Sequence, residues 1–85
     1  MGTLLGLAIE EVQVGESSEF VSKSLRQLAL RRELGVVILA IRRSSGEMIF
    51  NPTAEAEINA GDFLIAMGET ASLRRLERLI TEVRA

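Results

Sequence analysis

Two adjacent arginines, Arg42 and Arg43, follow the longest unbroken apolar run of the chain, Val36–Ile41. Nine of the ten basic residues are arginines, and a planar guanidinium group binds phosphate and carboxylate groups through paired hydrogen bonds. One interpretation of the pair is therefore a site for an anion. The other interpretation is that the two charges only make an exposed strand end and its hairpin more soluble.

The residues that most often carry catalysis or bind metals are largely missing. The chain contains neither cysteine nor histidine, which excludes disulfides, thiolate and imidazole metal sites, and nucleophiles that depend on either residue. Glu55, Glu57 and Asp62 offer oxygen ligands for calcium or magnesium, but their spacing matches no known metal-binding loop. We expect solvated carboxylates and a turn aspartate there, and neither a metal site nor an enzyme.

Length and composition limit the class of protein. The chain has 85 residues, 47% of them hydrophobic, and we expect one small globular domain over residues 1–85. A net charge of −2 gives no reason to expect a nucleic acid partner, and the apolar run is far shorter than the about 20 residues of a membrane helix. The lack of cysteine favours a cytoplasmic location. Because a strand pattern begins almost at residue 1, we expect a piece of a longer protein.

The hydrophobic pattern predicts an α+β fold with a small mixed or antiparallel sheet and two helices. The expected order is β-α-β-β-(β)-β-α, where the strand in parentheses lies in the 53–62 segment. Strands are predicted at 4–14, 36–43, 47–51 and 63–68, with helices at 22–34 and after residue 70. Two charges in a row, Glu10 and Glu11, interrupt the alternation of the first strand and predict a β-bulge there.

Single residues mark the predicted ends of these elements. Ser22 is the expected N-cap of the first helix and Gly35 its C-terminal stop. The hairpin turn contains Gly46, and Asn51–Pro52 ends the return strand because proline cannot donate to a β-ladder. A second turn is expected at Gly61–Asp62, and Thr70 is expected to cap the last helix. The apolar stripe of that helix consists of Leu73, Leu76, Ile80 and Val83.

The strand that precedes the arginine pair is apolar on both faces. Strict alternation places Val36, Ile38, Ala40 and Arg42 on one face, and Val37, Leu39, Ile41 and Arg43 on the other. The strand that begins at Phe63 has the same two-sided character, and two helices cover only one face of a small sheet. A second copy of the chain is the most economical cover for the other face, so the sequence predicts a homodimer.

Five segments in this order resemble one protein family. They are VSKSL (21–25), GVVILAIRR (35–43), NP (51–52), INAGDFLIAMG (58–68) and LRRLERL (73–79). Together they look like the RCK-C, or TrkA-C, domain, the C-terminal regulatory lobe of regulator-of-potassium-conductance proteins. The resemblance covers roughly residues 4–79. One departure is Ser22, where the family usually has glycine.

The resemblance implies a dimeric regulatory lobe on the cytosolic side of a membrane-embedded potassium or other cation channel or transporter. Some members bind cyclic di-AMP in the dimer cleft, and another small anionic ligand is an alternative. The implied ligand-binding positions are Val37, Ile38, Ile41, Arg42 or Arg43, Asn51 and Pro52. Apolar side chains would flank adenine, arginine would pair with phosphate, and asparagine would bond a base edge.

Two other interpretations remain open. In the first, Asn51–Pro52 only ends a strand and contacts no ligand. In the second, the whole domain is a structural dimerisation module with an empty cleft, which holds two larger chains together. Neither interpretation includes direct insertion into a membrane.

Overall fold

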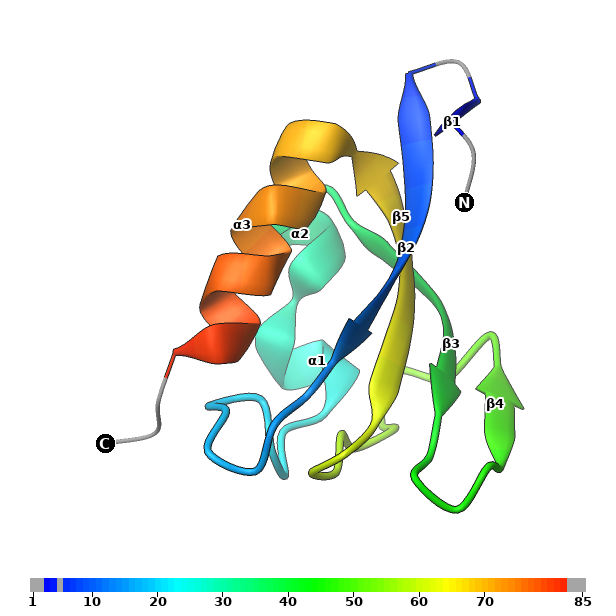
Figure 1. Cartoon of the computed structure of the whole chain (residues 1–85), viewed down its shortest axis with the longest axis vertical. Coiled ribbons are helices and arrows are strands. Elements are labelled where there is room, and N and C mark those ends of the chain that lie inside the picture. The colour runs from blue at the N-terminus through cyan, green and yellow to red at the C-terminus, as the bar shows by residue number, and fades with distance from the viewer. Residues whose placement is uncertain (1–2, 5, 83–85) are drawn as a thin grey trace.

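The computed structural model describes residues 3–4 and 6–82, which form a twisted antiparallel sheet with helices against one of its faces (Figure 1). The α+β class and the antiparallel form of the sheet are as the sequence predicts. The elements are β1 Thr3–Leu4, β2 Leu7–Gln13, α1 Leu25–Leu28, α2 Leu30–Leu34, β3 Val37–Arg42, β4 Met48–Phe50, β5 Phe63–Glu69 and α3 Thr70–Thr81. Strand order across the sheet is β1-β2-β5-β3-β4. None of the described helices has the length and apolar character that crossing a bilayer would need.

The predicted bulge at Glu10–Glu11 is wrong. Strand β2 pairs with β5 in unbroken register from Leu7 opposite Glu69 to Gln13 opposite Phe63. Both carboxylates fit a regular strand because each has an arginine partner on its own side of the sheet. Glu10 pairs with Arg74 of α3 on the helix side, and Glu11 pairs with Arg42 on the opposite side.

A bulge lies instead in β3, between Ile38 and Ala40. Leu39 is the extra residue, and it shifts the alternation of every residue that follows it. Ile41 is therefore fully buried in the core below the helices, whereas Ala40 pairs with Ile65 on the other face. The predicted faces hold up to Ile38 and are wrong beyond it, and this shift sends the two arginines to opposite sides from those expected.

The first predicted helix is split into α1 and α2 by Ala29, whose φ of 49° lies in the left-handed region. Its N-cap is Ser24 rather than Ser22, because Ser24 and Gln27 form a reciprocal capping box. Gly35 ends α2 with a φ of 72°, as predicted. The last helix starts at Thr70 with Glu69 as N-cap, so Thr70 is its first residue and not its cap.

The core lies between the helices and the inner face of the sheet. Leu73, Leu76 and Ile80 of α3 are buried in it, as the stripe predicts, while Val83 lies outside the described residues. The 53–62 segment forms no strand of its own, and an isolated bridge joins its Glu57 to Ser24. Its Ile58 is buried in the core, and backbone hydrogen bonds tie the segment to the start of α1 and to Val14.

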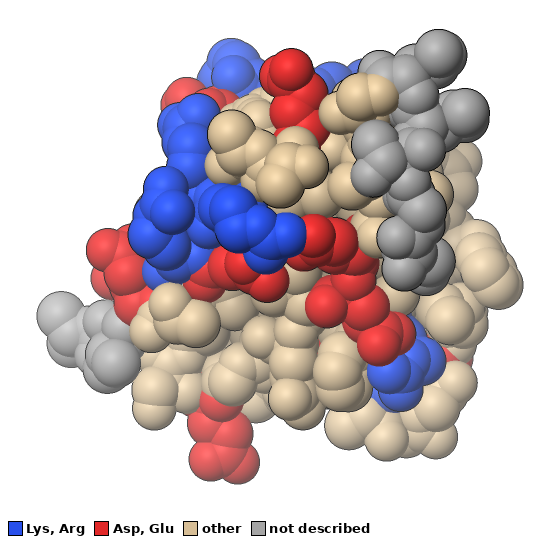
Figure 2. All heavy atoms as spheres, turned by 45° about the horizontal axis from the view of Figure 1, so that its top comes forward, with Lys and Arg blue, Asp and Glu red and all other residues tan. Residues whose placement is uncertain are grey.

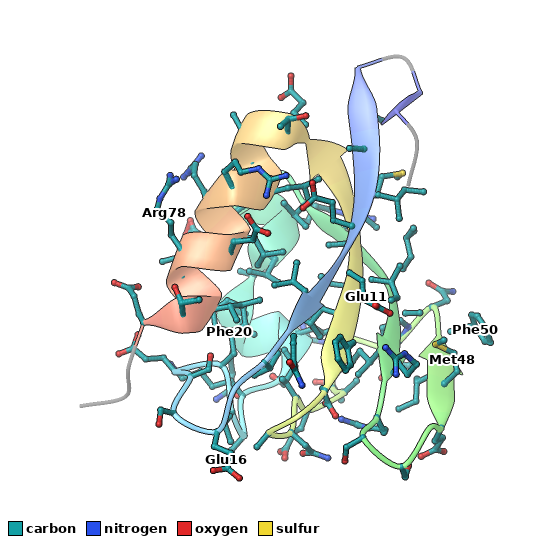
Figure 3. The ribbon with its side chains drawn as sticks, viewed as in Figure 1. Glu11, Glu16, Phe20, Met48, Phe50 and Arg78 are labelled. Atoms are coloured by element: carbon teal, nitrogen blue, oxygen red, sulfur yellow. The ribbon has the colours of Figure 1, made fainter. Side chains whose placement is uncertain are left out.

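The other face of the sheet, called here the open face, is covered by no described element (Figure 1). It carries Leu7, Ile9, Glu11, Val37, Ala40, Arg42, Met48, Phe50, Phe63, Ile65 and Met67. Phe50 is 75% exposed and, like Met48, projects from the outermost strand (Figure 3). The prediction that strands β3 and β5 are apolar on both faces is confirmed.

Candidate functional site

A groove of about 530 Å³ opens between α1–α2 on one side and β3 with the Pro52–Ala54 segment on the other. Its walls are mostly apolar, and three arginines of the two short helices line its helix side. The lining residues are Leu25, Arg26, Ala29, Leu30, Arg31, Arg32, Val36, Val37, Ile38, Pro52 and Ala54. Three of the predicted site residues, Val37, Ile38 and Pro52, therefore meet in one hollow.

Strand lengths create the sheet side of this groove. β4 ends at Phe50, opposite Ala40, so its ladder does not extend to Val37 and Ile38. Asn51 then adopts a φ of 47° and donates its backbone N–H to the Leu39 carbonyl at 2.8 Å. The chain turns there, and Pro52 joins the groove wall. The prediction that Asn51–Pro52 ends the strand is confirmed.

Hydrogen bonds from α1 hold the opposite wall in place. The first N–H groups of a helix have no partner within the helix. Here the Leu25 N–H donates to the Ala56 carbonyl at 3.0 Å, and the Arg26 N–H donates to the Ala54 carbonyl at 2.8 Å. The 54–56 segment thus completes the helix start, and the distance between these two walls is fixed by backbone contacts.

The Arg26 side chain carries a bidentate ion pair with Glu55. Its Nε donates to Oε2 at 3.0 Å and its Nη2 to Oε1 at 2.9 Å. The hydrogen bond from Arg26 lowers the pKa of Glu55, and the same bond raises the pKa of Arg26. Arg31 and Arg32 are exposed and take part in no ion pair among the described residues.

Arg42 lies away from the groove, on the open face. It pairs with Glu11 at 3.0 Å, and its guanidinium carbon sits 4.2 Å from the centre of the Phe63 ring. The cation therefore lies over an aromatic ring and next to a carboxylate, an arrangement in which arginine is favoured over lysine.

Arg43 lies at the root of the β3–β4 hairpin, on the helix side. It donates to the Glu57 carbonyl at 2.9 Å and forms an ion pair with Asp62, which is only 1% exposed. Asp62 also accepts the Asn59 N–H at 2.7 Å, so the predicted turn aspartate is confirmed. The carboxylates Glu55, Glu57 and Asp62 do not gather, and the described residues contain no cluster of three acidic groups that could hold a metal ion.

The remaining predicted residues lie apart. Ile41 has no exposed surface in the single chain, and it lies in the core on the inner face of β3. Asn51 is exposed at the turn that follows β4. The structure therefore brings Val37, Ile38 and Pro52 together, and leaves Arg42, Arg43, Ile41 and Asn51 outside the groove lining.

The sequence interpretation missed the arginines of the helix wall. The LRQLALRREL segment places three arginines on ten residues, and this density was the available signal. A second hollow of about 520 Å³ lies between α2 and α3, lined by Leu34, Arg75, Arg78, Leu79, Thr81 and Glu82. Figure 2 shows basic side chains gathered on the helix side of the molecule, and Arg78 projects outward from α3 (Figure 3).

Known proteins share this fold and this sequence pattern. Residues 9–81 match the TrkA-C domain family. A probable potassium channel protein 2 of Methanocaldococcus jannaschii is 32% identical over 74 residues, which are 87% of this chain and 21% of that protein. The chain thus spans about a fifth of that relative's length.

Two solved structures give the same result. The RCK C domain of the potassium transport protein KtrA, in complex with cyclic di-AMP, is 30% identical with a TM-score of 0.77, over 85% of this chain and 81% of that one. The RCK_C domain dimer of S. agalactiae BusR, also in complex with cyclic di-AMP, is 29% identical with a TM-score of 0.79, over 88% of this chain and 91% of that one. The family match spans most of the chain and the folds agree, so this chain belongs to the TrkA-C, or RCK_C, domain family.

Proposed function

We propose that this chain is a regulatory, ligand-binding lobe of a potassium or other cation channel or transporter, and that it acts as a homodimer on the cytosolic face of the membrane. The ligand is a small anion, with cyclic di-AMP as the first candidate. The observation that carries this proposal is the groove, where apolar residues meet three arginines. Flat apolar walls suit a nucleobase, and guanidinium groups suit phosphate.

The relatives support both parts of this proposal. One is named as a potassium channel protein and one as a potassium transport protein, and two structures hold cyclic di-AMP. Three of the positions implied by the family resemblance, Val37, Ile38 and Pro52, belong to the groove lining. The domain extent of 1–85 and its place in a longer chain remain part of the proposal.

The open face supports pairing of two copies. It carries large apolar side chains without a covering layer, among them Phe50, Ile65 and Met67. An uncovered apolar surface of this kind is typical of an interaction site. Val37 belongs both to this face and to the groove, so a second copy seated on the open face would border the ligand site. A two-fold pair also matches cyclic di-AMP, which has two identical halves.

Regulation would follow from a shift of population. A ligand that contacts both copies favours the relative arrangement in which its contacts are best, and it biases whatever is attached to the lobes. The alternative is a purely structural dimerisation module, which would pair in the same way but bind no ligand.

Calorimetric titration with cyclic di-AMP, combined with sedimentation of the same sample, separates the two. The proposal predicts a dimer that takes up one ligand per two chains. Ala54→Glu places a carboxylate in the groove and should abolish this binding, while Thr53→Glu, on the neighbouring exposed residue that does not line the groove, should not. A wild-type dimer that releases no heat with cyclic di-AMP would support the structural module instead.

A further inference from the structure

We propose that Arg31 and Arg32 of α2 bind the anionic groups of the ligand, and that Glu55 occupies the third arginine, Arg26, while the groove is empty. This inference rests on the proposed function, because it concerns the same groove. It moves the anion-binding role from the strand-end pair, Arg42 and Arg43, to the helix wall.

The strand-end arginines are already engaged. The Arg43 guanidinium donates through Nη1 to the buried Asp62 carboxylate and to the Glu57 carbonyl, and these two bonds hold it at the root of the hairpin. Arg42 faces the opposite side of the sheet from the core, paired with Glu11 and stacked on Phe63. Neither lines the groove.

Arg31 and Arg32 meet the requirements that the strand-end pair does not. Both line the groove, both are exposed, and neither takes part in an ion pair among the residues that the structure describes. Leu30 and Leu34 of the same helix are buried in the core and hold α2 in place. A ligand can therefore gain two charge-assisted contacts without breaking an existing one.

Arg26 differs from Arg31 and Arg32 because the Glu55 carboxylate of the same chain already binds it. The fork-to-fork geometry with Glu55, at 2.9 and 3.0 Å, is the one that a guanidinium also forms with phosphate. Both side chains are largely exposed, at 68% and 70%, and ion pairs in water are weak enough to be exchanged. Glu55 therefore competes with the ligand for Arg26 and lowers the apparent affinity of the groove.

The test is a calorimetric titration of cyclic di-AMP into the 85-residue chain and four variants. The double variant Arg31→Ala/Arg32→Ala should weaken binding by at least about ten-fold, since each lost contact is to a charged group. Its control, Arg75→Ala/Arg78→Ala, removes the same charge from the hollow between α2 and α3 and should change the affinity by less than about two-fold. Glu55→Gln should tighten binding by about two- to five-fold. Its control, Glu47→Gln, removes an exposed carboxylate of the hairpin and should have no such effect.

Each outcome decides between the two proposals. If the Arg31/Arg32 variant binds cyclic di-AMP with the affinity of the wild type, this inference is overturned and the proposed function stays intact. The same holds if the Arg75/Arg78 variant loses as much affinity as the Arg31/Arg32 variant. Unchanged affinity in Glu55→Gln overturns the competition by Glu55. If the wild-type chain is a dimer that binds no cyclic di-AMP, the proposed function itself fails, and this inference fails with it.

Discussion

Arg43 at the root of the β3–β4 hairpin is joined to Asp62, a buried carboxylate that directly precedes β5. The same guanidinium donates to the Glu57 carbonyl, and Asp62 accepts from the Asn59 N–H. Two contacts from Arg43 thus fasten the far end of the 53–62 segment to the sheet, and the bond from Asn59 to Asp62 holds the turn within the segment. The near end of that segment forms one wall of the groove, so Arg43 positions the groove from a distance.

Replacing Arg43 by alanine should therefore destabilise the fold. The change leaves the Asp62 carboxylate buried without its cation, which costs about 2–4 kcal/mol of unfolding free energy. Arg42→Ala is the matched control, because its pair with Glu11 is partly exposed and is worth about 0–1 kcal/mol. Denaturant unfolding of both variants measures the difference, and equal losses would contradict the structural role of Arg43.

Ser22→Gly should stabilise the chain. Ser22 has a φ of 70°, which glycine adopts without the steric penalty of a Cβ atom, and its exposed side chain makes no hydrogen bond to another residue that the structure describes. The expected gain is about 0.5–1 kcal/mol. Gly35→Ala, at a φ of 72°, should shift the stability in the opposite direction. A lower Tm for Ser22→Gly than for the wild type would show that relief of the left-handed backbone does not decide the stability at this position.

Charge placed on the open face should prevent pairing. Phe50→Asp alters a side chain that is 75% exposed, so the single chain should keep its secondary structure and lose only its partner. Leu79→Asp is the control, because Leu79 is 38% exposed on the helix side. Sedimentation equilibrium should give a monomer for Phe50→Asp and a dimer for Leu79→Asp. A dimer in both cases would mean that copies pair through another surface.

The ion pair of Arg26 with Glu55 has a defined pH dependence. The pKa of Glu55 is lower in the folded chain than its ordinary value of 4.5, chiefly because of the hydrogen bond from Arg26. A lowered folded pKa means that the stabilisation is complete above the ordinary value and is lost as the pH falls through the lowered one. Glu55→Gln should thus have a slightly lower Tm than the wild type at about pH 7, and the difference should be smaller at about pH 3. A Tm difference that is the same at both pH values would contradict the ion pair.

Local patterns predicted the elements, but not their fine register. Both faces of β3 are apolar, so a one-residue shift at Leu39 leaves the pattern equally apolar, and only pairing with β5 selects it. Alanine is a strong helix former, and nothing local marks Ala29 as the break between α1 and α2. Ser24 was predictable, because Gln27 three residues later completes a capping box that Ser22 lacks.

Only part of the site could be predicted, because some of it depends on contacts between residues far apart in the sequence. Val37, Ile38 and Pro52 belong to segments that resemble the family, and the groove contains all three. The arginines of α1 and α2 come into the site because the 54–56 segment bonds the start of α1, which is a contact between residues about thirty positions apart. No local signal in the sequence announces that contact.

An amide NMR titration of the labelled chain with cyclic di-AMP tests the proposed ligand site most directly. A ligand-binding lobe should give saturable shifts in α1, α2, Val37 and Ile38, and in Asn51 and Thr53 on either side of Pro52, with Arg75 and Arg78 unaffected. A chain that sediments as a dimer and shows no shift at any of these amides would contradict a ligand-binding lobe, and would leave a structural dimerisation module.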